Sequence, residues 1–155
     1  MSLIPVTAVA AARIARSFVF AAALAVTQAG TAWAGTPQEQ LGALSAQAGR
    51  SPNVAQGQQF FNAKHGREWS CASCHNAQPT GEGKHANTGK SISALAPAFN
   101  PERFTDPAKS GKWFRRNCND VLKRECTAAE KADVLAWLLK LDAKTAAAQP
   151  SKSTP

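Results

Sequence analysis

Methionine is nearly missing from this sequence of 155 residues, because the initiator Met1 is the only one. Large apolar side chains are also scarce, since alanine supplies much of the 44% hydrophobic content and aromatic residues make up only 7%. The length is near that of one domain, which excludes a large multidomain enzyme. With so little bulk from its own side chains, the core has to be completed by something else.

Acidic residues are outnumbered, because 18 Lys and Arg face 10 Asp and Glu and give a formal net charge of +8. Such a balance suggests an acidic partner or surface. The basic residues form no continuous stripe and no nucleic-acid-binding module is recognisable. We therefore expect no nucleic-acid partner.

The first 34 residues contain no acidic residue and have the organisation of a secretory signal peptide. Arg13 and Arg16 precede a short apolar stretch, and the segment ends in the small-x-small sequence Ala32-Trp33-Ala34. A membrane-spanning helix needs about 20 mostly apolar residues, so an uncleaved anchor is the less favoured alternative. We expect cleavage near Ala34-Gly35 and a mature periplasmic protein that has neither a membrane span nor a methionine.

Residues 35–142 are predicted to form one all-α domain, because apolar residues recur at helical spacing and no strand-like alternation is present. This spacing predicts helices over 37–48 and over about 54–64. From 76 to 100 the chain is rich in Gly, Pro, Asn, Thr and Lys, which indicates a long loop. The tail 143–155 is polar and broken by proline, so we expect it to be disordered.

Two further helices are predicted toward the C-terminus. Thr105 or Asp106, followed by Pro107, is a typical helix start. Farther on, Thr127-Ala-Ala-Glu130 has the sequence of a capping box. The helix after this box is predicted to bury one apolar face, made of Val134, Leu135, Trp137, Leu138 and Leu141.

Residues 71–75, Cys71-Ala-Ser-Cys74-His75, form a C-x-x-C-H sequence, which is the attachment signature of a c-type haem. Two cysteines at this spacing can each form a thioether to a porphyrin vinyl group, and the histidine then lies beneath the iron as an axial ligand. A thioredoxin-like redox pair would need a βαβ pattern, and a zinc site would need a second close cysteine pair. Neither is present, so one covalent haem c is predicted, and it would supply the bulk that the core lacks.

The two other cysteines are Cys118 and Cys126, eight positions apart. Once Cys71 and Cys74 are assigned to thioethers, these two can form only one disulfide. In an exported protein we expect this bond to form. It would hold the backbone beside Asn117, ahead of the last helix.

The helices on either side of the C-x-x-C-H sequence resemble the crossing terminal helices of the class I cytochromes c. In that family a glycine permits the close approach and an aromatic side chain fills the contact, and the matching positions here are Gly57, Phe60-Phe61 and Trp137-Leu138. The resemblance implies a class I cytochrome c fold around the haem. Ordinary members complete the iron coordination with a methionine, which the mature chain does not have.

Several residue types are open as the sixth ligand. His65 is expected on the helix that leads into the C-x-x-C-H sequence, from which it would struggle to reach the other haem face. His85 lies ten residues after His75 in the long loop and can reach the iron. If it is the sixth ligand, the protein is a bis-His electron carrier. A lysine would have to lose its proton, and asparagine, water or no ligand also remain open.

A more specific resemblance runs from about Phe60 to Leu141. The stretches LAPAFNPERFTD, WFRRNC and TAAEKADVLAWL resemble the family of the sphaeroides haem protein and cytochrome c-double-prime. In these exported monohaem cytochromes the sixth ligand directly precedes the first disulfide cysteine, as asparagine in one type and histidine in the other. The resemblance implies that Asn117 binds the iron in this chain, with Asn119 as its nearby competitor.

The identity of this ligand leads to a predicted function. An amide oxygen is a hard and weak donor that suits ferric iron better than ferrous iron. Reduction should therefore release Asn117, and ferrous haem would then bind O2, NO or CO, as the family does transiently. We therefore expect a non-enzymatic one-electron carrier that also binds diatomic gases. The alternative is a haem enzyme that acts on NO and O2 or on peroxide.

The excess of basic residues predicts a redox partner with an acidic docking face, such as the dihaem c-type cytochrome found with this family. Basic residues around the haem-bearing segments would steer such a partner toward the haem edge. They are Lys84, Lys90, Lys109, Lys112, Arg115, Arg116, Lys123 and Arg124.

Overall fold

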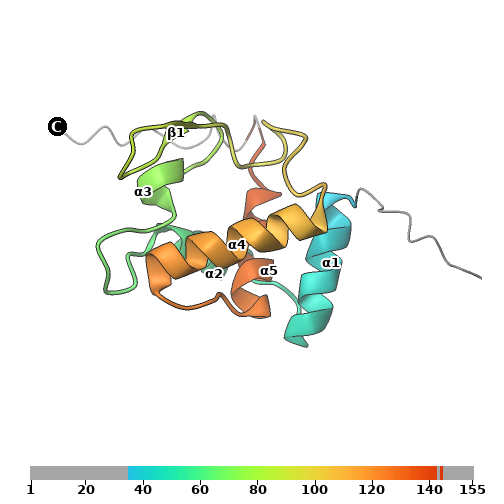
Figure 1. The fold of residues 1–155 in the computed structure, drawn as a ribbon. Helices are drawn as coiled ribbons and strands as arrows, with labels where there is room; N and C mark the ends of the chain where they lie inside the picture. The colour runs from blue at the N-terminus through green and yellow to red at the C-terminus, as the bar shows by residue number, and fades with distance from the viewer. Residues whose placement is uncertain (1–34, 143, 145–155) are drawn as a thin grey trace, which may run out of the picture. The chain divides into compact units, whose positions relative to one another are not determined.

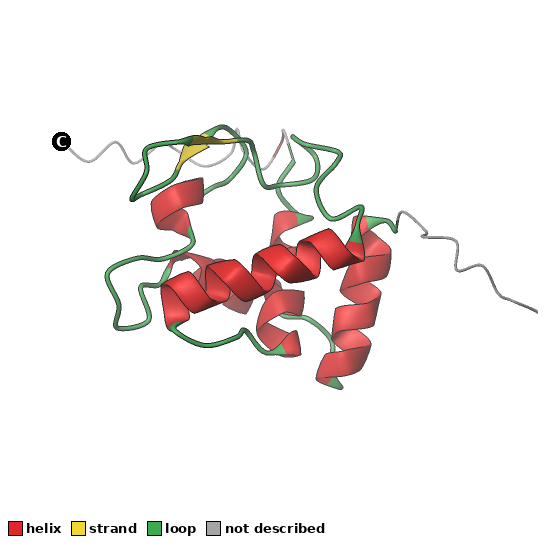
Figure 2. Cartoon of the chain, viewed as in Figure 1, coloured by secondary structure: helices red, strands yellow, loops and turns green. Residues whose placement is uncertain are grey.

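The computed structural model describes residues 35–142 and residue 144. The predicted signal peptide, residues 1–34, lies outside the described residues, and so does nearly all of the predicted tail, 143–155. The described part of the chain folds into five helices and one pair of very short strands (Figure 1). Long green connections separate the helices in Figure 2, most of all between the third and fourth helices.

Two helices precede the C-x-x-C-H sequence. α1 spans Pro37–Ala48, as predicted, and α2 spans Val54–Asn62, which is two residues shorter than predicted. Thr36 and Glu39 form a capping box at the start of α1. The helix ends at Gly49, whose φ of 66° is in the left-handed region that favours glycine.

Two longer helices lie toward the C-terminus, and both begin where the sequence predicted. α4 spans Pro107–Leu122 and is capped by the Asp106 side chain. α5 spans Ala128–Leu138 and starts at the capping box formed by Thr127 and Glu130. Among the described residues, no helix has both the length and the apolar character that crossing a membrane requires.

The segment predicted as a loop, residues 76–100, contains a small hairpin. β1 (Gly83–Lys84) pairs antiparallel with β2 (Ser91–Ile92), and Gly83 lies opposite Ile92. Strands of two residues are too short to show an alternating pattern, so the sequence could not reveal them. Apart from this hairpin, the described chain is all-α, as expected.

The core lies where α2 crosses α5. Gly57 of α2 is buried, and a Cβ atom at this position would lie 2.0 Å from the backbone oxygen of Asp133 in α5. Only glycine permits this approach, because any side chain would collide with the facing backbone. One helical turn later Phe61 packs on Trp137, with ring centroids 5.0 Å apart. This is the helix crossing that the resemblance to class I cytochromes c implied.

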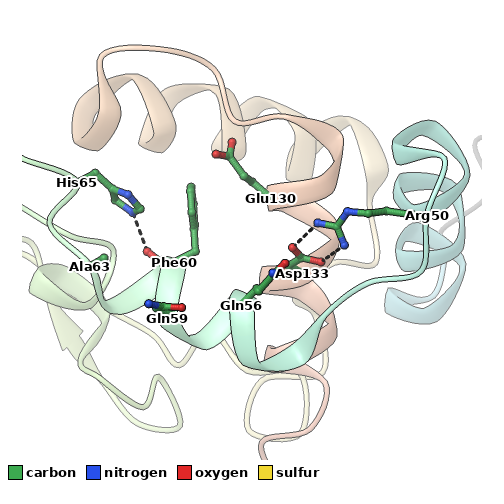
Figure 3. Close-up of a pocket in the computed structure, with 8 residues that line it drawn as sticks. All are labelled: Arg50, Gln56, Gln59, Phe60, Ala63, His65, Glu130 and Asp133. Atoms are coloured by element: carbon green, nitrogen blue, oxygen red, sulfur yellow. Dashed lines mark hydrogen bonds and ion pairs between the residues drawn. The ribbon is translucent and has the colours of Figure 1, made fainter.

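Burial of α5 extends beyond its predicted apolar face. Every residue from Ala132 to Leu138 is buried, including the charged Asp133. The Asp133 carboxylate accepts hydrogen bonds of 3.0 and 2.6 Å from the Arg50 guanidinium (Figure 3). It also accepts one of 2.7 Å from the Asn53 N–H. Burial by itself would raise the pKa of Asp133, but these hydrogen bonds lower it. The pair joins residues 83 positions apart, so no local pattern could predict it.

Candidate functional site

The C-x-x-C-H residues lie together on one helical turn. α3 spans Ala72–His75 and follows directly after Cys71. The N–H groups of Cys74 and His75 both donate to the Cys71 carbonyl, at 3.2 and 3.1 Å. Residues three and four apart share one face of a helix, so this turn presents both thiols and the imidazole on the same side.

The turn is anchored to the helix crossing. The His75 ring lies 6.2 Å from the Phe61 ring, which in turn packs on Trp137. Cys71 and Ala72 pack against the same core cluster. The crossing of α2 and α5 therefore fixes where these residues stand.

Burial changes the proton affinity of two groups in this turn. It raises the pKa of the Cys71 thiol to about 11. Burial, with smaller contributions from the charges of Arg103 and His85, lowers the pKa of His75 to about 4. His75 is thus neutral near pH 7, which is the form of imidazole that binds a metal.

The β1–β2 hairpin lies against α3 (Figure 1). A Cβ atom at Gly83 would stand 2.2 Å from the Cys74 carbonyl oxygen, so only glycine allows this contact. In the hairpin turn, the Ala86 N–H donates to the Cys74 sulfur at 3.3 Å. The hairpin therefore contacts the second cysteine, a relation that loop composition alone did not indicate.

His85, the alternative sixth ligand, lies in the same hairpin turn. Its Nδ1 accepts hydrogen bonds from the backbone N–H groups of Asn87 and Thr88, at 3.3 and 3.2 Å. It is also close enough to His75 for its charge to lower the pKa of that residue. His85 thus lies in the turn that contacts Cys74.

The prediction that His65 lies on the helix leading into the C-x-x-C-H sequence is wrong. α2 ends at Asn62, and His65 follows in a turn with a φ of 50°. Its ring nitrogen Nε2 is hydrogen-bonded to the Phe60 carbonyl at 2.8 Å, and the two rings lie 4.4 Å apart. The backbone is already extended at Ala63, so the helix ends before the predicted position and does not include His65.

α4 carries the remaining predicted residues and is attached to the core at two points. Cys118 and Cys126 form a disulfide, with their Cα atoms 5.6 Å apart. One turn before Cys118, the Phe114 ring lies 6.0 Å from Phe104, and both pack against the core cluster that Cys71 also contacts.

The two asparagines of α4 differ in direction and in bonding. At about 100° per residue, Asn117 projects about 60° from Phe114, whereas Asn119 projects about 140° from it. The Asn119 amide donates to the Arg115 carbonyl of its own helix at 2.9 Å. The exposed Asn117 side chain forms no hydrogen bond with the described part of the chain. Its amide is therefore available on the side of α4 that faces the core.

A shallow pocket lies elsewhere, between α2 and α5 (Figure 3). Its charged groups are already paired, because Asp133 binds Arg50 and Glu130 binds Arg124. None of the predicted haem residues lines it. The lining residues are Arg50, Gln56, Gln59, Phe60, Ala63, His65, Glu130 and Asp133. This pocket is part of the scaffold and does not contribute to the candidate haem site.

The residues of the C-x-x-C-H turn fit a covalently attached haem. Cys71 and Cys74 are both free thiols, the imidazole of His75 is neutral, and an apolar cluster with aromatic rings adjoins them. Thiols at this spacing form thioethers, and the next histidine is the usual proximal ligand. The fold and the site together define the class of protein, a c-type cytochrome with helices arranged as in class I.

Comparison with known proteins narrows this class to one family. Residues 47–138 match a family model described as a domain of unknown function, DUF1924. Cytochrome c-type protein SHP of Cereibacter sphaeroides is 42% identical over 121 residues, an alignment that covers 74% of this chain and 93% of SHP. Cytochrome c'' of Methylophilus methylotrophus is 44% identical over 93 residues, which are 57% of this chain and 65% of that protein.

Solved structures agree with the sequence relatives. Oxidised SHP, described as an oxygen-binding cytochrome c, superposes with a TM-score of 0.63 at 42% identity and covers 67% of this chain and 96% of its own. Oxidised cytochrome c'' of Methylophilus methylotrophus gives a TM-score of 0.60 at 36% identity, with 67% and 93% covered. The chain belongs to the DUF1924 family and is a relative of SHP, and it carries one covalently attached haem c.

Proposed function

We propose that this protein is an exported one-electron carrier whose haem also binds diatomic gases. Cys71 and Cys74 hold the haem, His75 is the proximal ligand and Asn117 is the sixth ligand. The bound haem supplies one-electron redox chemistry and, where its sixth position is open, an iron that binds O2, NO or CO. The oxygen binding described for SHP, at 42% identity, supports this proposal.

The arrangement of α4 is the observation that carries the choice of Asn117. Phe114 ties α4 to the cluster that Cys71 contacts, and Asn117 lies on the adjoining side of the helix. Its amide has no competing hydrogen bond among the described residues, whereas that of Asn119 is bonded to its own helix. Of the two asparagines, Asn117 is the one free to bind a metal.

The position of His85 argues against a bis-His carrier. The two axial ligands of a haem approach the iron from opposite faces. Ala86, the residue after His85, contacts the Cys74 sulfur, so the hairpin turn that carries His85 lies against the helical turn that carries His75. The His85 Nδ1 is also occupied by two backbone donors. These contacts favour a supporting role for His85 on the His75 side.

Asn117 has the properties of a ligand that can leave the iron and return to it. Its amide oxygen is neutral, hard and weakly basic, so it suits oxidised iron better than the softer reduced iron. The adjacent Cys118–Cys126 disulfide holds the backbone in place while the side chain turns away. From there the Asn117 Nδ2 can donate a hydrogen bond to a gas molecule at the vacated position.

Export and a docking surface complete the proposal. The Cys118–Cys126 disulfide supports a compartment outside the reducing cytosol. Exposed cations of α4 precede Asn117 in the sequence, and Trp113 among them is 43% exposed. We name this surface, made of Lys109, Lys112, Trp113, Arg115 and Arg116, the α4 cation face. It would dock the acidic face of a partner cytochrome.

The proposal is tested by replacing the sixth ligand in the haem-loaded protein. Asn117→His and Asn117→Met introduce ligands that stay bound on reduction, so both states should become low-spin and CO affinity should fall at least tenfold. Asn119→Ala is the matched control on the same helix and should leave CO affinity unchanged. Absorption spectra of the oxidised and reduced forms, with and without CO, provide the measurement.

Three outcomes would contradict this assignment. Unchanged CO affinity in both Asn117 variants would show that Asn117 is not the sixth ligand. Opening of the site by His85→Ala, seen as a gain in CO affinity, would identify the bis-His alternative. Catalytic consumption of NO and O2 faster than autoxidation would favour an enzyme.

A further inference from the structure

Phe104 has a backbone conformation that a bulky residue rarely adopts. Its φ is 60°, in the left-handed region where the Cβ atom of an L-residue crowds its own backbone. Hydrogen bonds hold the residues on both sides of it. The Arg103 Nε donates to the Ala94 carbonyl at 3.0 Å, and the Thr105 hydroxyl donates to the Glu102 carbonyl at 2.9 Å. A conformation of this kind persists only where the surroundings enforce it, and it often marks a functional site.

The carbonyl of Phe104 is held by α1. Of the twelve residues of this helix only Gln40 is buried, although its side chain is polar. A buried amide needs a hydrogen-bond partner, and the Gln40 Nε2 donates to the Phe104 carbonyl at 2.5 Å. α1 and α4 also begin side by side (Figure 1), because a Cβ atom at Gly35 would lie 3.6 Å from the Pro107 Cγ. α1 therefore holds the segment that leads into α4.

The Phe104 ring connects this held segment to α4. It lies 6.0 Å from the Phe114 ring, and both rings pack against the core cluster. Phe114 stands about one helical turn before Asn117, the proposed sixth ligand. Because α4 itself buries only Cys118 and Val121, the contact between the two rings fixes where the helix lies ahead of Asn117.

We infer that Gln40 and Phe104 are positioning residues for the proposed sixth ligand, and that their hydrogen bond holds Asn117, through Phe114, where it can bind oxidised iron. This inference rests on the proposed function, because it requires Asn117 to be a ligand. An added ligand of oxidised iron competes with Asn117 for the same position. Its apparent affinity therefore reports the fraction of the iron that Asn117 leaves open.

The hydrogen bond and the ring can be removed separately. Gln40→Leu keeps a side chain of similar size but cannot donate to the Phe104 carbonyl. Phe104→Gly accepts the left-handed backbone but lacks the ring. Gln47→Leu is the matched control, because it makes the same change at an exposed glutamine of α1. Azide affinity of the oxidised, haem-loaded proteins is measured by spectroscopic titration, together with thermal unfolding.

We expect Asn117→Ala to raise azide affinity about tenfold, because it removes the competing ligand. Gln40→Leu and Phe104→Gly should each raise it about threefold, and Gln47→Leu should leave it unchanged. Since the effect passes through Asn117, Gln40→Leu should add nothing when it is combined with Asn117→Ala. A purely structural role of Gln40 would lower the melting temperature and leave azide affinity as in the control.

Two results would overturn the inference while leaving the proposed function intact. One is a rise in azide affinity that is no larger in Gln40→Leu than in Gln47→Leu. The other is an equal rise from Gln40→Leu in the presence and absence of Asn117, which would mean that Gln40 acts on the site by another route. If Gln40→Leu does not fold, Phe104→Gly takes its place in both comparisons. Unchanged azide affinity in Asn117→Ala would instead refute the proposed function itself, because Asn117 would not be the sixth ligand.

Discussion

α5 and α4 are both well-capped helices, yet they meet the rest of the protein in different ways. Seven consecutive residues of α5, 132–138, are buried. α4 is longer but buries only Cys118 and Val121, and its other attachment is the half-buried Phe114 ring. One helix is enclosed by the fold, and the other is fastened to it at separate points.

This difference separates stability from chemistry. A side chain enclosed like those of α5 cannot change without disturbing its neighbours. On α4, Asn117 and the α4 cation face are exposed, so one substitution can change the proposed ligand or the docking surface without disturbing the core. We therefore expect changes in α5 to act mainly on stability and changes in α4 to act mainly on ligand binding and electron transfer.

The largest loss of stability is expected at Gly57, where α2 comes closest to α5. Gly57→Ala would put a Cβ atom 2.0 Å from the Asp133 backbone oxygen, so α2 and α5 would have to move apart. Overpacking of this kind costs about 3 kcal/mol or more where backbone is the obstacle. Denaturant unfolding of the haem-loaded protein measures the change.

Gly42→Ala is the matched control for that substitution. Gly42 is exposed in α1, and nothing lies within 4 Å of a Cβ atom there. Alanine is the better helix former, so this change should stabilise the protein by up to about 1 kcal/mol. Equal effects from the two alanines would show that α2 and α5 are not closely packed.

The disulfide of α4 comes next in expected effect. Replacing Cys118 and Cys126 together by serine frees a nine-residue loop, which should cost about 2.5 kcal/mol by loop entropy. Because the bond also holds the backbone beside Asn117, CO affinity should change in the same variant. Loss of stability with unchanged CO affinity would mean that α4 needs no such fastening to hold its proposed ligand.

Local signals were enough to predict most of the helical framework. Thr127 with Glu130 and Asp106 with Pro107 are short-range patterns, and both helices begin where these patterns predicted. The helix crossing was predicted from Gly57, Phe60-Phe61 and Trp137-Leu138, through resemblance to a family. These features need only neighbouring residues or a known relative to be recognised.

What escaped prediction depends on contacts between distant parts of the chain. The β1–β2 hairpin has two residues in each strand, and its contact with Cys74 requires that Gly83 meet a backbone nine residues away. Arg50 and Asp133 were two unremarkable charged residues in the sequence. Only the folded structure shows that Asp133 is buried and that Arg50 forms an ion pair with it.

Asp133 offers a smaller and pH-dependent test of α5. Asp133→Asn loses charge-assisted hydrogen bonds to Arg50 in a buried position, which should cost about 1–2 kcal/mol near pH 7. The folded-state pKa of Asp133 is lowered from 3.8, so its stabilisation is complete above pH 3.8 and is lost as pH falls below that value. Unfolding at pH 7 and pH 3 should therefore show a smaller difference between variant and wild type at pH 3. A constant difference would mean that the Asp133 charge does not stabilise the fold.

The smallest effect on stability is expected on α4 itself. The Arg116 guanidinium lies 5.6 Å from the Trp113 ring centroid and 4.0 Å from the Asp120 carboxylate, with 64% of its side chain exposed. Exposed contacts of this kind are worth little, so Arg116→Gln should change stability by less than about 0.5 kcal/mol. The same change should slow oxidation of the reduced protein by ferricyanide about twofold at low salt, because it weakens attraction to an anion.

Lys131→Gln removes the same charge from α5 and is the matched control for that measurement. If α4 is the docking helix, only Arg116→Gln should flatten the dependence of the ferricyanide rate on ionic strength. Equal flattening in both variants would show that the reaction responds to net charge and that the α4 cation face has no special part in docking. The contrast between the helices would then hold for stability and proposed ligand binding alone, because attraction of an anion would no longer distinguish the exposed helix from the enclosed one.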